Sequence, residues 1–190
     1  FKEALRASLQ NTSPAITDLG EGQCVNCGAK NEGHRKFCKE CAVSLRVDCL
    51  SCGDEIPVWD QVCPECGTKQ IELLEERRKA MSAQQSRAET RLRNYDFDQA
   101  TTLAVTLRDE PDPRLQQLNG WSKQFLEQVE SGRKQQRERI GTLLSEALQH
   151  ARAYDYPSGI HTLEQVPEIL RGTSIPGQSL TPAKLLKRLN

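Results

Sequence analysis

Cysteine is the residue type with the clearest chemical role in this sequence. Positions 24 to 41 read CVNCGAKNEGHRKFCKEC, and positions 49 to 66 read CLSCGDEIPVWDQVCPEC. Both stretches follow the spacing Cys-x2-Cys-x10-Cys-x2-Cys, and the second begins 25 residues after the first. Together they contain all eight cysteines of the chain, so each stretch supplies four thiols and none is left over.

Four thiols at this spacing are typical of a structural zinc site. A Cys-x2-Cys pair forms a tight turn that directs two thiolates at one point, and two such turns complete a tetrahedron around the metal. We therefore expect two structural zinc ions, each in a closed site with no open coordination position. The ligands of the first are Cys24, Cys27, Cys38 and Cys41, and those of the second are Cys49, Cys52, Cys63 and Cys66.

Glycine follows the second cysteine in three of the four pairs, as Gly28, Gly53 and Gly67. A positive φ at this position costs glycine nothing, because it has no Cβ. The fourth pair has Ala42 there, where we expect backbone strain but no loss of metal binding.

Other uses of the cysteines are open. Eight cysteines allow 105 disulfide pairings, although disulfide frameworks rarely repeat one spacing so strictly. A redox Cys-x-x-Cys normally occurs once, within a βαβ unit, and iron–sulfur chemistry is a further alternative. His34 could replace a cysteine ligand, but each set of four is complete, so we interpret it as a solvated loop residue.

The two stretches resemble the double zinc ribbon domain of bacterial proteins. The resemblance covers residues 24–70 and rests on CGAKNEGHRKFCKECAVSL and CLSCGDEIPVWDQVCPECGTKQ. It implies two small zinc-held β-hairpins that act as a non-catalytic module within a larger protein. Because families with this domain are diverse, it identifies a fold more firmly than a function.

The ribbons have few apolar side chains, so zinc must provide much of their folding free energy. Trp59 is interpreted as cover for the second hairpin, with an exposed contact for a partner as the alternative. We expect the remaining apolar residues to form the ribbon core: Val25, Phe37, Leu45, Leu50, Ile56, Val58 and Val62.

The charge of the chain disfavours nucleic acid as a partner. Its 26 Lys and Arg residues are balanced by 26 Asp and Glu residues. Residues 21–70 have six basic and eight acidic side chains, and each four-thiolate zinc site adds about two negative charges. The loaded ribbons are therefore acidic, which opposes contact with phosphate groups.

From residue 71 the sequence has the pattern of helices. Residues 71–95 have sparse apolar positions at seven-residue spacing and predict one long exposed helix. Asp96 can cap a second helix, which Pro111 and Pro113 end. A third helix is expected to start near Arg114, and its centre, ESGRKQQRER, is either a solvated bridge or a break.

Two of the expected helix ends are related in sequence. RNYDFDQATTLAVTL at 93–107 aligns with RAYDYPSGIHTLEQV at 152–166, at an offset of 59 residues. We expect αα-hairpins that resemble tetratricopeptide-like repeats, although that family has a 34-residue period. In this interpretation Tyr95 and Tyr154 are wedged between helices, and Trp121 and Phe125 are core residues.

The predicted fold is therefore a tandem pair of small zinc-stabilised β-hairpin ribbons, followed by an all-α region of long helices and αα-hairpins. The chain begins at Phe1 rather than Met, and we expect it to be a fragment of a longer protein. We predict the end of a preceding domain and a linker at 1–23, the double ribbon at 24–70, the helical hairpins at 71–172, and a linker at 173–190 with a further helix from Thr181–Pro182.

No catalytic and no cofactor-binding residue is predicted, because the sequence has no P-loop, kinase catalytic loop, Gly-x-Ser-x-Gly or His-Glu-x-x-His motif. It also lacks a run of 18 apolar residues that could span a membrane. No small-molecule substrate is evident. We therefore expect these residues not to be an enzyme.

We expect a cytoplasmic region of a larger bacterial protein that contacts protein partners or neighbouring domains, or acts as a spacer. Its order of segments is similar to the region after the catalytic domain in some large bacterial serine/threonine protein kinases. One alternative is nucleic-acid binding through the ribbons. Another is delivery of substrate to a catalytic domain elsewhere in the full-length chain.

Overall fold

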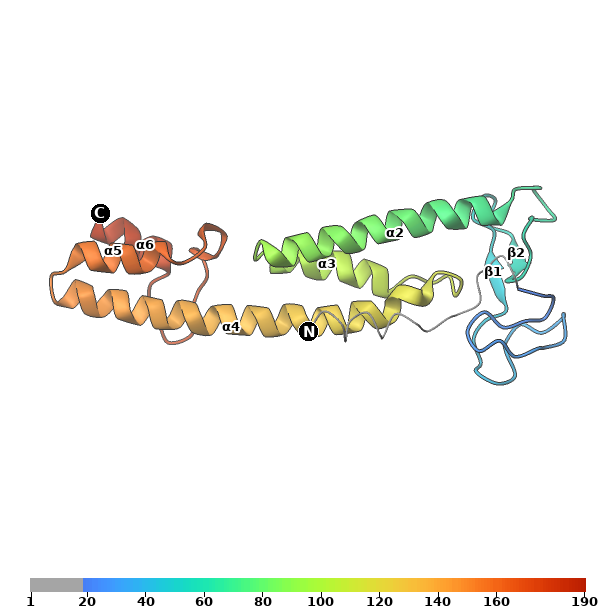
Figure 1. Cartoon of the computed structure of the whole chain (residues 1–190), viewed down its shortest axis with the longest axis horizontal. Helices are drawn as coiled ribbons and strands as arrows, with labels where there is room; N and C mark the ends of the chain where they lie inside the picture. The colour runs from blue at the N-terminus through green and yellow to red at the C-terminus, as the bar shows by residue number, and fades with distance from the viewer. Residues whose placement is uncertain (1–18) are drawn as a thin grey trace, which may run out of the picture. The chain divides into compact units, whose positions relative to one another are not determined.

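The computed structural model describes residues 19–190. As the sequence predicts, two tandem ribbons with a small antiparallel sheet are followed by an all-α region (Figure 1). Most of the segment predicted at 1–23 lies outside the described residues. By their contacts, the described residues form two compact units, one of residues 19–83 and 107–120, the other of residues 84–106 and 121–190.

The ribbon backbone is built from four copies of one turn. Strand β1 (Arg46–Asp48) pairs antiparallel with β2 (Glu55–Pro57), with Asp48 opposite Glu55. Single bridges occur at three equivalent places, Gln23–Lys30, Phe37–Ser44 and Val62–Lys69. In all four, the residue before a cysteine pair faces the third residue after that pair, so each pair lies inside the same closed turn.

The ribbon core differs from the prediction at two equivalent positions. Phe37 is 61% exposed and Val62 is 50% exposed, so the prediction that they are buried is wrong. Each precedes a buried cysteine, Cys38 or Cys63, and adjacent residues in extended chain point to opposite faces. The buried apolar side chains of the ribbons are Leu19, Val25, Leu45, Val47, Ile56 and Val58, and Leu50 is half-buried.

Trp59 packs against this core and is half-buried, as predicted. The guanidinium carbon of Arg46 lies 5.7 Å from the centre of its ring, which places a cation over the ring. The tryptophan therefore covers the second hairpin rather than projecting into solvent.

Two long helices match the predicted pattern after residue 70. Helix α2 (Gln70–Arg93) is the expected long exposed helix, and it buries Leu74, Met81 and Ala88 at seven-residue spacing. Helix α3 (Phe97–Arg108) follows it. Within the second unit, the end of α2, α3 and α4 pack around one core (Figure 1).

The third helix starts later than predicted. Helix α4 (Asn119–Arg152) follows a short 3-10 turn, η2 (Gln116–Leu118), rather than beginning near Arg114. Arg114 is held in a non-helical turn because its backbone N–H and its side chain both donate to the carboxylate of Asp112. The polar centre of α4 stays helical without a break, so it is the solvated bridge of the two alternatives.

The two related helix ends have the same structure. Tyr95 and Tyr154 have φ values of 61° and 60°. The N–H of the following aspartate, Asp96 or Asp155, donates to a carbonyl five residues back at 2.9 Å in both cases. Each aspartate then accepts a hydrogen bond of 3.3 Å from the N–H three residues ahead and so caps the next helix.

Burial differs between these two corners. Tyr95 is half-buried and packs on the core of the second unit, whereas Tyr154 is 81% exposed. The prediction that Tyr154 is wedged between helices is therefore wrong. The two corners have the same backbone, so the difference arises from the surroundings: Tyr95 packs on the core of the second unit, and Tyr154 belongs to neither core of that unit.

The rest of the second unit closes around the end of α4. Helix α5 (Tyr156–Glu164), the 3-10 turn η3 (Glu168–Leu170) and helix α6 (Pro182–Leu189) follow in order, and α6 begins where predicted, with the Thr181 hydroxyl as its cap. The rings of Trp121 and Phe125 stack at 4.6 Å within the core, as expected of core residues. A second cluster joins α4, α5 and α6 through Leu144, Ala147, Leu163 and Leu185.

Candidate functional site

The eight cysteines form two separate clusters of four. Within each cluster, all four Sγ atoms lie within 4.8 Å of one another, and the members are the two sets predicted from the spacing. Two Sγ pairs are 3.6 Å apart in the first cluster, and two are 3.7 Å apart in the second. A zinc–sulfur distance of about 2.3 Å in a tetrahedron requires sulfur–sulfur separations of about 3.8 Å.

This geometry fits zinc and excludes disulfides. All eight cysteines are free, and their separations are far above the roughly 2 Å of a sulfur–sulfur bond. Four thiolates complete the coordination of each ion, so the two zinc ions are structural. His34 is exposed and belongs to neither cluster.

Each cysteine pair sits in a turn whose backbone is fixed by two hydrogen bonds. The N–H of the first cysteine donates to the carbonyl five residues ahead, and its carbonyl accepts from the N–H four residues ahead, at 2.8–3.0 Å. The residue after the second cysteine has positive φ in all four turns: 72° at Gly28, 58° at Ala42, 83° at Gly53 and 70° at Gly67. The strain expected at Ala42 is therefore present.

Backbone N–H groups and burial shift the pKa values of the cysteine thiols in opposite directions. Hydrogen bonding from the Cys41 backbone lowers the pKa of Cys38 to about 6, while burial raises the pKa of Cys24 to about 12. At Cys49, burial acts to raise the pKa, but bonds from the backbone of Cys52 and Ser51 lower it to about 6. Four thiolates this close repel one another, so a divalent cation is required to hold all four deprotonated.

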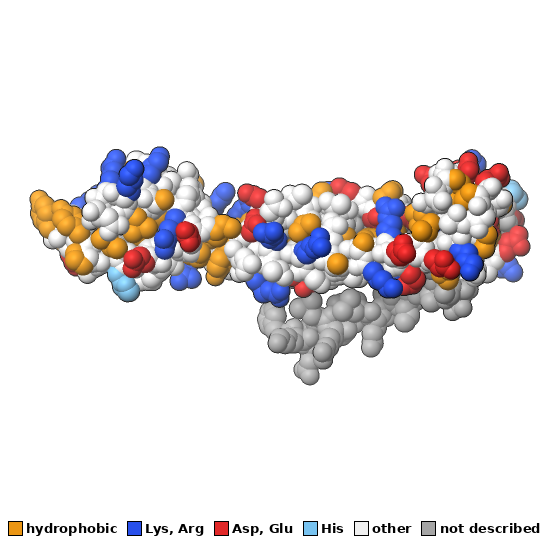
Figure 2. Space-filling model, turned by 90° about the horizontal axis from the view of Figure 1, so that it is seen from above, with side chains coloured by type: hydrophobic (Ala, Val, Ile, Leu, Met, Phe, Trp, Pro, Cys, Tyr) orange, Lys and Arg blue, Asp and Glu red, His pale blue; other side chains and the backbone are white. Residues whose placement is uncertain are grey.

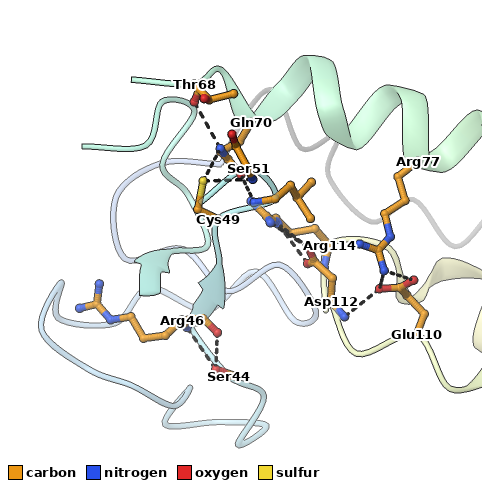
Figure 3. Close-up of polar contacts among 11 residues, drawn as sticks. Ser44, Arg46, Cys49, Ser51, Thr68, Gln70, Arg77, Glu110, Asp112 and Arg114 are labelled. Carbon is orange, nitrogen blue, oxygen red and sulfur yellow. Dashed lines mark hydrogen bonds and ion pairs between the residues drawn. The ribbon is translucent and has the colours of Figure 1, made fainter. Parts of the chain in front are cut away.

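One buried side-chain amide contacts each cluster, and sequence reasoning missed both. Asn31 places its Nδ2 3.7 Å from the Sγ of Cys38. Gln70 places its Nε2 3.2 Å from the Sγ of Cys49, and its Oε1 accepts from the N–H of Leu50 (Figure 3). Such donors outside the ligand set orient the ligands and tune the metal.

A buried ion pair lies beside the second ribbon and was also missed. The side chain of Arg114 is fully buried, and Asp112 is 9% exposed. Their closest N–O distance is 2.7 Å, and Figure 3 shows Arg114 directed at Asp112. A lone arginine in a polar loop gives no periodic signal, so its burial could not be found in the sequence.

Aromatic side chains are exposed at the second corner. Tyr154 is 81% exposed and Tyr156 43% exposed, and their rings meet edge to face at 6.4 Å. Figure 2 shows hydrophobic side chains gathered at the left edge of the view, where α4 turns into α5 in Figure 1. At the first corner the equivalent Phe97 is only 8% exposed.

No helix within residues 19–190 combines the length and hydrophobicity needed to cross a lipid bilayer. A search of curated proteins and a search of solved structures gave no significant match to the chain. A protein-family model for the double zinc ribbon matches residues 24–67, less than a quarter of the chain and the segment that contains both metal clusters. Residues 24–67 are thus a double zinc ribbon with two structural zinc sites.

Proposed function

We propose that this chain is a non-catalytic module through which a larger, intracellular bacterial protein contacts a protein partner or a neighbouring domain of its own chain. Both zinc sites support this proposal, because four thiolates leave no coordination position for a substrate or an activated water. The repeated helical corners support it as well, because stacked helical hairpins are a common scaffold for protein contacts.

The exposed tyrosine pair is the observation that carries the proposal. At the first corner, Phe97 packs against α4, and the guanidinium of Arg133 is 5.8 Å from its ring centre. The equivalent pair at the second corner, Tyr154 and Tyr156, has the same edge-to-face packing but lies open. Tyrosine and arginine are enriched in the strongest contacts of protein interfaces. A partner helix that presents a basic side chain would therefore complete the second corner.

The kinase context belongs to the same proposal. The order of a double zinc ribbon and then helical hairpins is similar to the region after the catalytic domain of some large bacterial serine/threonine protein kinases. In such a protein, the module would act as a spacer or interaction arm, and its zinc sites would stabilise the fold without taking part in catalysis.

Site-specific cross-linking tests the proposal. A photoreactive phenylalanine analogue replaces Tyr154 in one variant and Phe37 in a matched control, because Phe37 is also an exposed aromatic but lies on a ribbon. After irradiation in cells that produce the protein natively, we expect one identified protein segment to be cross-linked from position 154 and not from position 37. Tyr156→Ala should reduce this product. Equal background at both positions, or recovery of nucleic acid from the ribbon variant, would overturn the proposal.

A further inference from the structure

Gln70 belongs to a ribbon and to a helix at the same time. It is the first residue of α2, and it is fully buried. Its side chain donates to the Sγ of Cys49 at 3.2 Å and accepts from the N–H of Leu50 at 3.0 Å, so it contacts the first cysteine turn of the second ribbon. Its own N–H donates to the carbonyl of Gln61 within the same ribbon.

The corresponding amide of the first ribbon has no such connection. Asn31 donates to the carbonyls of Gly22 and Ala29 and accepts from the N–H of Lys39. These partners, together with Cys38, are all residues of the first ribbon. Each zinc site therefore has a buried amide donor. Asn31 lies within the first ribbon, whereas Gln70 is also the first residue of helix α2.

Packing continues from Gln70 into the helix and the loop after α3. A cavity of about 10 Å³ is lined by Val58 and Trp59 of the second ribbon, by Gln70 and Leu74 of α2, and by Arg114. This volume admits at most one water molecule. The buried charge of Arg114 thus lies directly against ribbon residues and the first turns of α2.

Besides its contact with the ribbon, the first part of α2 has an ion pair of 3.1 Å between Arg77 and Glu110 and few buried side chains. Within residues 70–83, the buried side chains are Gln70, Leu74 and Met81. Most of the stability of a helix in a protein comes from tertiary packing of its apolar face rather than from helix propensity. The contact with the ribbon is therefore one of the few contacts that hold this part of the helix.

We propose that Gln70 makes zinc occupancy of the second site a condition for the folding of residues 70–83 and the Arg114 loop, whereas the buried amide of the first site makes no contact with α2. Without the second zinc, the thiolates repel one another and the turn at Cys49 loses its fixed geometry. Gln70 then loses its hydrogen bonds to Cys49 and Leu50, and water reaches Arg114. Zinc at the second site thereby controls the folding of the start of α2, in addition to stabilising its own ribbon.

Two equivalent ligand substitutions test this dependence on zinc in the 190-residue chain. Cys38→Ser and Cys63→Ser remove the third ligand of the first and of the second site, and native mass spectrometry confirms one zinc in each variant. Hydrogen exchange is then measured at the amides of residues 75–83. We expect exchange at least tenfold faster than in the parent for Cys63→Ser and unchanged exchange for Cys38→Ser. Equal protection in the two variants would overturn the proposal.

A second pair of variants changes the buried amide of each site and leaves all the metal ligands in place. Gln70→Glu and Asn31→Asp each replace the buried donor by a carboxylate of nearly the same shape. Loss of an outer-shell partner typically lowers metal affinity 10- to 100-fold. Chelator competition should show this loss at the second site for Gln70→Glu and at the first site for Asn31→Asp, each measured in the background that retains only that site.

The two amide variants must also differ in the helix. With zinc in excess, Gln70→Glu should still accelerate exchange at residues 75–83, and Asn31→Asp should not. Coupling is reciprocal, so Leu74→Ala, which changes no ribbon residue, should weaken zinc binding at the second site only. An unchanged second-site affinity in both Gln70→Glu and Leu74→Ala would show that Gln70 packs beside the site without linking it to α2.

Discussion

Tyr95 and Tyr154 lie 59 residues apart at the same position of a repeated corner, and both have the left-handed backbone conformation, with φ of 61° and 60°. Their surroundings differ, because Tyr95 packs on the core and Tyr154 is 81% exposed. The backbone of the corner is therefore independent of whether its aromatic residue is buried. Sequence similarity predicted the shared backbone, and burial has to be read from the structure.

Replacing each tyrosine by glycine separates these two contributions. Glycine removes the steric cost of positive φ but adds entropy to the unfolded chain. For Tyr154→Gly, little packing is lost, and we expect the free energy of unfolding to stay the same or rise by up to about 1 kcal/mol. For Tyr95→Gly, lost contact with Phe97 and the core should lower it by about 1–3 kcal/mol.

Urea unfolding followed by helical circular dichroism measures both changes. The parent chain and a Tyr156→Phe variant, which retains the ring at an exposed position, serve as controls. A loss of more than about 1 kcal/mol for Tyr154→Gly would show that the exposed ring stabilises the fold, contrary to its environment.

The strained alanine of the first ribbon gives a second prediction. Ala42 has φ of 58° at a position that is glycine in the other three turns. Ala42→Gly should stabilise the first ribbon by about 1 kcal/mol, which corresponds to roughly fivefold tighter zinc binding at that site. The equivalent residue of the second ribbon is Gly67, and Gly67→Ala should weaken the second site by a similar factor.

Chelator competition in single-site backgrounds measures both effects. An added Cβ at Gly67 meets no atom within 4 Å, so the loss there reports backbone strain and not a clash. If Ala42→Gly leaves zinc affinity unchanged while Gly67→Ala reduces it, the strain at Ala42 is relieved by some other feature of the first ribbon.

The cysteine spacing predicted both metal centres because tetrahedral coordination dictates which residues must meet, whatever the rest of the chain does. Helices α2 and α3 were predictable from apolar spacing and from the cap at Asp96. Gln70 and Arg114 were not, because polar residues are buried only when specific partners surround them. The predicted burial of Phe37 and Val62 was wrong for the opposite reason. The sequence shows that both residues are apolar, but the adjacent metal ligands determine which way their side chains face.

The buried ion pair beside the second ribbon leads to a third prediction. Asp112→Asn removes the charge that balances Arg114 and leaves the shape nearly unchanged. An uncompensated buried charge typically costs about 3–5 kcal/mol, whereas replacing both partners by apolar residues is often neutral. We therefore expect Asp112→Asn to destabilise the first unit by that amount, and Asp112→Leu with Arg114→Met to recover most of it.

Trp59 fluorescence in a Trp121→Phe background reports the unfolding of the first unit, because Trp59 lines the cavity beside Arg114. The comparison is made with zinc in excess, so that metal loss does not add to the effect. A double variant as unstable as Asp112→Asn would show that the pair stabilises the unit through its own hydrogen bonds rather than by mutual neutralisation.

Metal content and metal removal provide the last prediction. Protein purified without added metal should contain close to two zinc ions per chain, because each four-cysteine cluster supplies a complete set of zinc ligands. Structural zinc typically contributes on the order of 10 kcal/mol of folding free energy per site, so a strong chelator should unfold both ribbons.

The two cores of the second unit contain no cysteine, and their helices should keep their hydrogen-exchange protection after the metal is removed. Elemental analysis and exchange on the same sample measure both quantities. A zinc content near zero, with four disulfides by mass, would contradict the assignment of the clusters. Full loss of protection in α5 and α6 would contradict the independence of the second core, since unfolding would then have spread beyond the residues that zinc holds.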